Sequence, residues 1–97
     1  MIVTPAQNGS TIQVKPGEPI EVHLPENPTT GHKWTPTETG PVALVGDDYE
    51  KTSSTIGGGG VRKFKFVAHG DGIVKLIHKR PWEDQGVGDF TLNVEIT

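Results

Sequence analysis

The sequence contains no cysteine, few aromatic residues, no excess of basic residues and no long apolar run. Without cysteine there can be no disulfide, no thiolate metal ligand and no cysteine nucleophile, so packing alone must hold the core. The formal net charge is -3, and the lysines and arginines are spread along the chain. They form no basic stripe of the kind that phosphate backbones require, so we do not expect nucleic acid as a partner.

The apolar runs are short, as in Val42 to Val45. A membrane helix needs about 20 apolar residues, so no membrane partner is expected. The segment from Met1 to Gly9 does not resemble a signal peptide, which favours cytoplasmic residence, or a secreted or periplasmic location if a signal has been removed. We expect a monomer without a cofactor.

Thirteen glycines and eight prolines punctuate the 97 residues, and no helical period is present. Such frequent breaks disfavour helices and suit many short strands joined by turns. A chain of this length buries roughly 60–70% of its unfolded surface, which is enough for one core. The sequence therefore predicts a single domain over residues 1–97 that is entirely β.

Alternating apolar and polar residues mark the strands, most clearly where Phe90, Leu92, Val94 and Ile96 alternate with polar neighbours. The number and spacing of strands are typical of an immunoglobulin-like β-sandwich of about seven to eight strands. Trp34 occupies a position at which such sandwiches commonly bury a tryptophan. The seven predicted strands are Ser10–Val14, Pro19–Leu24, His32–Thr37, a strand within Val42–Thr52, Val61–Ala68, Gly72–Lys79 and Asp89–Ile96.

Two details of this prediction stay open. Ile2 and Val3 could add a further short edge strand. Gly46, Asp47 and Asp48 interrupt the fourth strand, which indicates either a bulge or a switch between edges.

Three connections have unusual compositions, and all three are alternate links between successive strands. Because successive antiparallel strands reverse direction, alternate links are expected at the same end of the sandwich. The first, Leu24–His32, carries two prolines and a glycine and is expected to be stiff and protruding. The second, Ser53–Gly60, has four successive glycines, so its backbone can lie flush against another surface, with Ile56 available to fill a pocket. The third begins at Arg80-Pro81-Trp82 and pairs the residue types most enriched in binding hot spots.

Each feature also has an ordinary structural interpretation. A glycine run is most often a flexible linker, and Asn27-Pro28 alone is an ordinary turn. Trp82 alone would more often cover the edge of the sandwich than bind a partner. The combination on alternate links favours a composite binding surface.

These three motifs, taken in order, resemble the signature loops of the chagasin family of cysteine-protease inhibitors. The family patterns are N-P-T-T-G, G-x-G-G, and R-P followed by an aromatic residue. The matching residues are Asn27, Pro28, Thr29, Thr30 and Gly31, then Ile56 with Gly57, Gly58, Gly59 and Gly60, then Arg80, Pro81 and Trp82.

The resemblance implies reversible, non-covalent occlusion of the active-site cleft of papain-like (clan CA) cysteine proteases. It places Thr29 and Thr30 near the catalytic cysteine, Ile56–Gly60 along the unprimed side, and Arg80 and Trp82 on the primed side. The sequence departs from the family pattern at His32, where Tyr or Phe is usual. This departure predicts altered packing at the base of the loop and a mild pH dependence of binding.

Two other classes of function are open alternatives. An enzyme is disfavoured because no two of the four histidines have the spacing of a metal pair or a nucleophile dyad; His23 and His69 are expected to face solvent or turns, and His78 to lie in a strand. A carbohydrate-binding or adhesion module would favour several aromatics on one face, yet most of those present alternate inward. Asn8-Gly9-Ser10 matches a glycosylation sequon, a pattern short enough to arise by chance.

Overall fold

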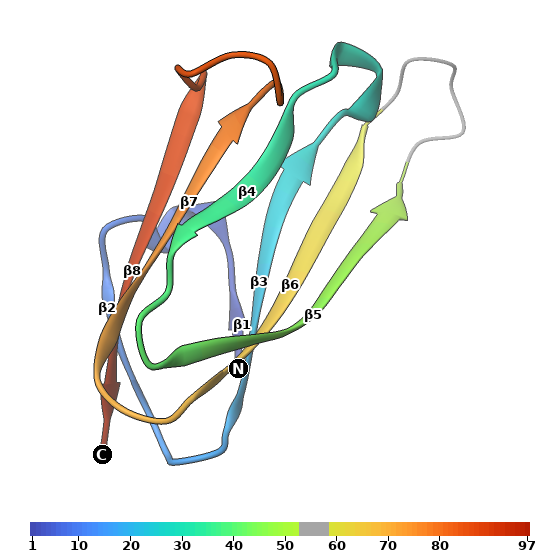
Figure 1. The fold of residues 1–97 in the computed structure, drawn as a ribbon. Coiled ribbons are helices and arrows are strands. Elements are labelled where there is room, and N and C mark those ends of the chain that lie inside the picture. Colours follow the sequence, from blue (N-terminus) through green and yellow to red (C-terminus); the bar gives the residue numbers. More distant parts are fainter. Residues whose placement is uncertain (53–58) are drawn as a thin grey trace.

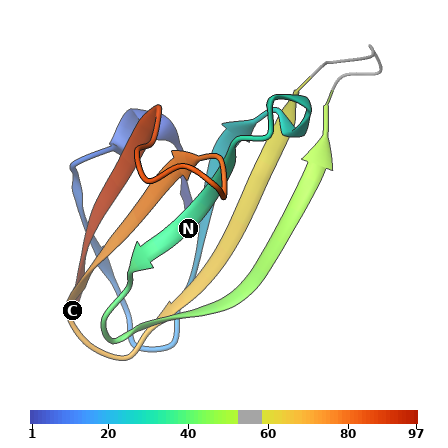
Figure 2. The same cartoon turned by 45° about the horizontal axis from the view of Figure 1, so that its top comes forward.

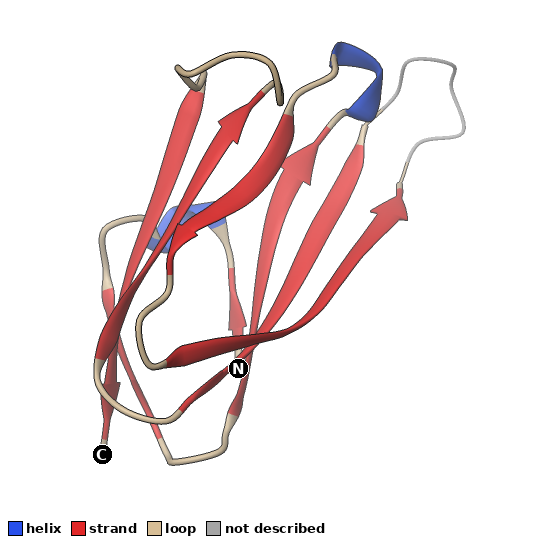
Figure 3. Cartoon of the chain, viewed as in Figure 1, coloured by secondary structure: helices blue, strands red, loops and turns tan. Residues whose placement is uncertain are grey.

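The computed structural model describes residues 1–52 and 59–97, and over these residues the chain forms a two-layer β-sandwich (Figure 1, Figure 3). Within these residues, two one-turn 3-10 helices accompany the strands. The elements are β1 (Ile2–Val3), η1 (Pro5–Gln7), β2 (Thr11–Val14), β3 (Pro19–Glu26), η2 (Pro28–Thr30), β4 (Lys33–Glu38), β5 (Val42–Lys51), β6 (Gly60–Ala68), β7 (Gly72–Lys79) and β8 (Gly88–Ile96).

The strands form two four-stranded sheets with the orders β1-β3-β6-β5 and β2-β8-β7-β4. The N-terminal segment belongs to both layers, since β1 pairs in parallel with β3 and β2 pairs in parallel with β8. All other pairings between the described strands are antiparallel. The prediction of an all-β sandwich is confirmed, and Ile2 and Val3 do form the additional edge strand.

The core follows the alternation that the sequence predicts. Ile20, Val22 and Leu24 of β3 are buried, and Phe90 and Leu92 of β8 face them from the second sheet. Trp34 is 8% exposed and is part of the same cluster, as expected for this position. Burying such side chains contributes roughly 1.5–3 kcal/mol each, so packing alone can hold a domain of this size.

The strand β3 is two residues longer than the sequence predicts. It continues through Pro25 to Glu26, which pairs with Gly60. Proline lacks an amide hydrogen and suits only an unpaired edge of a sheet. The neighbouring strand β1 ends at Val3, opposite Val22, so β3 has an open edge at Pro25 and the proline is tolerated.

The interruption in β5 is a bulge. The register to β6 shifts between Leu44 and Gly46, and the strand then continues to Lys51. An irregularity also interrupts the pairing of β4 with β7 between Pro36 and Glu38, and β4 begins at Lys33, one residue later than predicted.

The β3–β4 and β7–β8 connections lie at one end of the sandwich, together with the ends of β5 and β6 that flank residues 53–58 (Figure 1, Figure 2). Figure 2 shows the β3–β4 connection between the β7–β8 connection and the ends of β5 and β6 that flank residues 53–58. The tight turns at 39–41 and 69–71 lie at the other end. The predicted arrangement of links is therefore present in the described part of the chain.

Among the described residues, no helix is long and apolar enough to cross a membrane.

The sequon asparagine has a structural role at β8. Asn8 Nδ2 donates to the Asp89 carbonyl at 3.2 Å, and Asn8 Oδ1 accepts from the Thr91 amide at 2.9 Å. These bonds fix the start of β8 and account for the residue without glycosylation.

Candidate functional site

The first loop (residues 27–32) is held by hydrogen bonds within itself. Asn27 Oδ1 accepts from the amide and the hydroxyl of Thr29 at 3.1 and 2.7 Å. The Asn27 carbonyl accepts from the amide and the hydroxyl of Thr30 at 3.2 and 2.9 Å. Gly31 has a φ of 80°, which returns the chain toward β4 and which L side chains rarely adopt. The loop is thus a closed turn that presents Thr29 and Thr30 to solvent.

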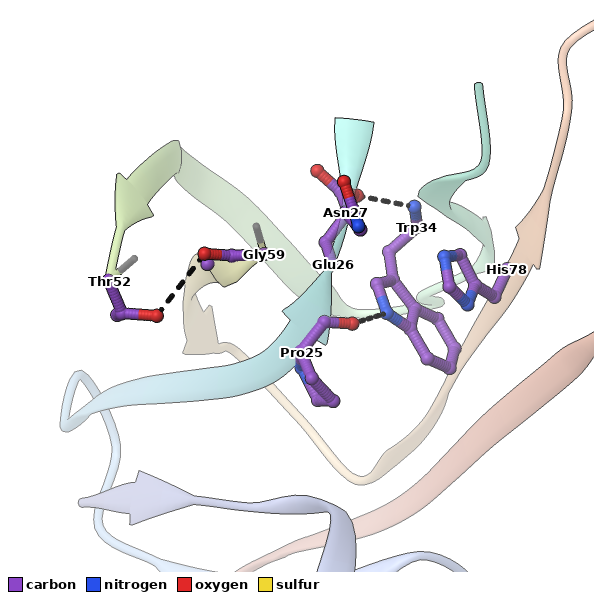
Figure 4. A pocket seen from close by; sticks show the side chains of 8 residues that line it. Pro25, Glu26, Asn27, Trp34, Thr52, Gly59 and His78 are labelled. Atoms are coloured by element: carbon purple, nitrogen blue, oxygen red, sulfur yellow. Dashed lines mark hydrogen bonds between the residues drawn. The ribbon is translucent and has the colours of Figure 1, made fainter. Parts of the chain in front are cut away.

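The two ends of the first loop are joined through Trp34. Its backbone amide donates to Glu26 Oε1 at 2.8 Å, and its indole nitrogen donates to the Pro25 carbonyl at 2.9 Å (Figure 4). Because β3 and β4 belong to different sheets, these two bonds also link the layers directly beneath the loop.

Glu26 is buried, with only 1% of its side chain exposed, and it is paired with Arg62 of β6. Glu26 Oε2 accepts from Arg62 Nε at 2.9 Å and from Nη2 at 2.6 Å, while Nη1 donates to Asp47 at 3.0 Å. Burial disfavours the charged form of Arg62, but the hydrogen bonds to Glu26 and Asp47 outweigh it and raise the pKa of the guanidinium above its ordinary value. At the end that carries the loops, the sandwich therefore contains a buried ion pair between Glu26 and Arg62.

Gly60 begins β6 at a place where no side chain fits. A Cβ there would collide with the Glu50 carbonyl and the hydroxyl of Tyr49. The Tyr49 hydroxyl donates to the Glu26 carbonyl at 3.4 Å, and the Tyr49 ring lies 5.3 Å from the Arg62 guanidinium carbon. The last glycine of the run thus has a packing role within the domain, in addition to any role in binding.

The third loop (residues 80–87) is attached to the first. Arg80 Nε donates to the Thr30 carbonyl at 3.0 Å, and Nη1 donates to Glu83 at 3.3 Å. The Trp82 ring lies 5.9 Å from the Arg80 guanidinium carbon, and a Cβ on Gly31 would be only 3.2 Å from Trp82 Cη2. Trp82 is 73% exposed, so it does not cover the edge of the sandwich.

The predicted site residues that can be placed lie at one end of the molecule. Arg80 and Trp82 contact the first loop at Thr30 and Gly31, and the position of a Cβ on Gly59 is 3.8 Å from the Asn27 Cβ. Ile56, Gly57 and Gly58 fall outside the described residues. The other ten belong to the first loop, the Gly59–Gly60 segment or the third loop: Asn27, Pro28, Thr29, Thr30, Gly31, Gly59, Gly60, Arg80, Pro81 and Trp82.

A pocket of about 520 Å³ lies at the base of the first loop, beside Gly59 and Gly60. Figure 4 shows Trp34 and His78 on one side of it and Gly59 on the other. The pocket therefore lies at the end of the sandwich that carries the loops.

A series of ring contacts runs from the Trp34 indole through His78 to His32. The His78 ring stacks on Trp34 at 4.7 Å, and His32 meets His78 edge-on at 5.6 Å. His32 Nδ1 lies 3.1 Å from the Thr30 hydroxyl, so the residue at the usual aromatic position forms a hydrogen bond within the first loop. His69 is exposed, as predicted, whereas His23 is half-buried.

Stability is expected to fall in mild acid because of His78. Burial lowers the pKa of His78, the proximity of His32 lowers it further, and Glu26 raises it in part; His78 Nε2 is covered and lacks a partner among the described residues. Since the folded state holds this proton less firmly than the unfolded chain, the free energy of unfolding is fully retained above about pH 6.5 and declines as the pH drops below it. Urea midpoints at pH 7.5 and 5.5 measure the decline.

The matched variants are His78→Phe, which keeps a ring on Trp34, and His69→Gln at the exposed histidine. The difference between the two pH values is expected to shrink in His78→Phe and to stay as in the wild type in His69→Gln. An unchanged difference in His78→Phe would show that other groups cause the acid sensitivity.

Comparison with protein-family models matches residues 13–95 to the chagasin family peptidase inhibitor I42. The chain belongs to the chagasin family of peptidase inhibitors. This confirms the family indicated by the three motifs, and it places the chain among inhibitors rather than enzymes. In the described residues no group of three or more histidine, aspartate or glutamate side chains is arranged to hold a metal ion.

Individual relatives are similar to this chain over most of their length. Chagasin of Trypanosoma cruzi is 37% identical, and the match covers 82% of this chain and 81% of chagasin. Amoebiasin-1 of Entamoeba histolytica is 31% identical, and the match covers 99% of both chains. The crystal structure of the cysteine protease inhibitor EhICP2 from Entamoeba histolytica superposes with a TM-score of 0.87 at 25% identity, covering 99% of this chain and 94% of that one.

The three motifs give no indication of the charged and aromatic residues beneath the loops, which are Glu26, Arg62, Asp47 and Tyr49. The signal was present, because the inward-facing series Ile20, Val22 and Leu24 of β3 leads to Glu26 at the next inward position. In the same way the series Phe66, Phe64 of β6 leads to Arg62. Two opposite charges at adjacent inward positions predict a buried ion pair.

Proposed function

We propose that this chain is a reversible, non-covalent inhibitor of papain-like (clan CA) cysteine proteases that fills their active-site cleft with the loop-bearing end of the sandwich. The observation that carries the proposal is the physical joining of the motifs, since Arg80 is hydrogen-bonded to Thr30 and Gly59 adjoins Asn27. Membership of a family of peptidase inhibitors supports the same conclusion.

The shape of the first loop suits occlusion without cleavage. A peptidase cleaves a substrate that offers an extended peptide carbonyl in the orientation of nucleophilic attack. Here Pro28–Thr30 form one helical turn, and the Thr30 amide is bonded to the Asn27 carbonyl at 3.2 Å. A turn closed in this way can enter a cleft beside the catalytic cysteine without presenting an extended peptide bond.

The roles of individual residues follow the family pattern. Thr29 and Thr30 would lie near the catalytic cysteine, Ile56–Gly60 along the unprimed side, and Arg80 with Trp82 on the primed side. The exposure of Thr29, Thr30 and Trp82 is consistent with these roles. Residues 1–97 would act as one monomeric domain, and an interface of roughly 800 Å² per partner is sufficient for nanomolar affinity when the loops are preorganised.

The direct experiment is a titration of papain with the purified chain. Stoichiometric loss of peptide hydrolysis, recovery of activity on dilution and an intact inhibitor by mass spectrometry are expected. Unchanged hydrolysis at micromolar concentrations of the chain, tested against several papain-like enzymes, would contradict the proposal. Cleavage of the chain within residues 27–32 would contradict the proposed mode of occlusion.

A further inference from the structure

A single buried carboxylate connects the segments that enter and leave the loops. Glu26 is the last residue of β3 and precedes the first loop, and its Oε1 accepts from Trp34 near the start of β4 at 2.8 Å. Its Oε2 accepts twice from Arg62, two residues after the start of β6. The carboxylate thus joins both ends of the first loop to the strand that follows residues 53–58.

We propose that Glu26 and Arg62 are positioning residues that hold the first loop and the start of β6 in the geometry required for inhibition. This inference rests on the proposed function. Neither residue needs to touch the protease, because the Glu26 side chain is 1% exposed and that of Arg62 is 15% exposed.

The ion pair differs from an apolar contact because its hydrogen bonds are directional. The neighbouring inward positions of β3 and β6 hold Leu24 and Phe64, which pack without fixing the direction of a backbone group. A carboxylate receives hydrogen bonds only in defined geometries, and a guanidinium offers a rigid fork of donors. Replacing a buried ion pair by well-packed apolar residues is often neutral or stabilising, and in some proteins buried polar groups instead specify one conformation.

The third nitrogen of the guanidinium also donates a hydrogen bond. Arg62 Nη1 donates to Asp47, just beyond the β5 bulge, and the guanidinium lies over Tyr49. Arg62 is therefore held from β5 and β3 together, so it cannot shift without moving Glu26. Because Trp34 donates to Glu26, the base of the first loop is held in a fixed position relative to Arg62.

The test compares Glu26→Ala and Glu26→Gln with Val94→Ala, a core variant. Val94 pairs with Gly72 at the start of β7, at the end of the sandwich away from the loops, so its substitution lowers stability without touching them. Two quantities are measured well below the melting temperature of every variant: the inhibition constant for papain, and amide exchange of Thr29, Thr30 and His32 by NMR.

Glu26→Ala is expected to weaken inhibition at least tenfold, chiefly through slower association, because the competent loop geometry would be only fractionally populated. Its loop amides are expected to exchange faster than in Val94→Ala. Glu26→Gln keeps an acceptor for the Trp34 amide and should be intermediate in both measurements. It also provides the test if Glu26→Ala does not fold.

Loop exchange and inhibition equal to those of Val94→Ala would overturn the inference. If the wild type inhibits no papain-like enzyme, the proposed function fails. The exchange comparison then still decides whether Glu26 positions the first loop.

Discussion

Replacing Trp82 with alanine is expected to weaken inhibition of papain about 30-fold or more without loss of the fold. The side chain is 73% exposed, so removing it leaves no cavity in the core. An exposed tryptophan beside an arginine is typical of an interface anchor, and truncating such an anchor costs about 2 kcal/mol or more of binding energy, or about 30-fold in affinity. Inhibition constants for both proteins, measured with the same enzyme preparation, provide the test.

Val87 is a suitable control for this prediction. It is another large apolar residue of the third loop and is 69% exposed, but it lies outside the three motifs. Val87→Ala is expected to change the inhibition constant less than threefold, within the ~0.5 kcal/mol usual for surface substitutions. Equal effects of the two substitutions, or no effect of Trp82→Ala, would remove Trp82 from the proposed interface.

Replacing Arg62 with methionine is expected to be the most destabilising change among the charged residues discussed above. It leaves the Glu26 carboxylate buried without its cationic partner, and such a loss typically costs about 3–5 kcal/mol. In a domain of this size each kcal/mol lowers Tm by roughly 4–8 °C, so the midpoint should fall by tens of degrees. Thermal unfolding followed by circular dichroism measures the change.

Two further variants identify the cause of this loss. Lys75→Met removes an ion pair with Glu38 in which both side chains are at least half exposed, and its effect is expected to be within about 1 kcal/mol. Glu26→Gln combined with Arg62→Met removes the unpaired charge and should regain most of the lost stability. If the double variant is as unstable as Arg62→Met, the penalty does not come from the buried carboxylate.

Most of the fold could be predicted from the sequence because burial alternates with a period of two. Phe90, Leu92 and Val94 are buried where the pattern places them, and so are Ile20 and Val22. That the β3–β4 and β7–β8 connections lie at the same end was also predictable, because successive antiparallel strands reverse direction. The bulge in β5 was one of two alternatives, and only the pairing with β6 decides between them.

The true end of β3 could not be predicted from local sequence. Pro25 indicates the end of a strand wherever both edges are paired, and the sequence does not show that β1 stops opposite Val22. Because the predicted strand ends at Leu24, Glu26 falls in the predicted loop, although it is the last inward residue of β3. The predicted end of the strand therefore gives no indication of the ion pair between Glu26 and Arg62.

The contacts that join the loops likewise depend on tertiary structure. The motif Arg80-Pro81-Trp82 predicts two binding residues, yet the Arg80 guanidinium also donates to the Thr30 carbonyl, 50 residues away. His32 was recognised as a departure from the family pattern, but its edge contact with His78 follows only from the pairing of β4 with β7.

The central claim is that one end of the sandwich enters the protease cleft, and amide exchange of the chain, free and bound to papain, tests it most directly. The account predicts new protection at residues 27–32 and 80–83 and unchanged exchange in the opposite turns at 39–41 and 69–71. Protection confined to those opposite turns, in a complex that inhibits the enzyme, would contradict it.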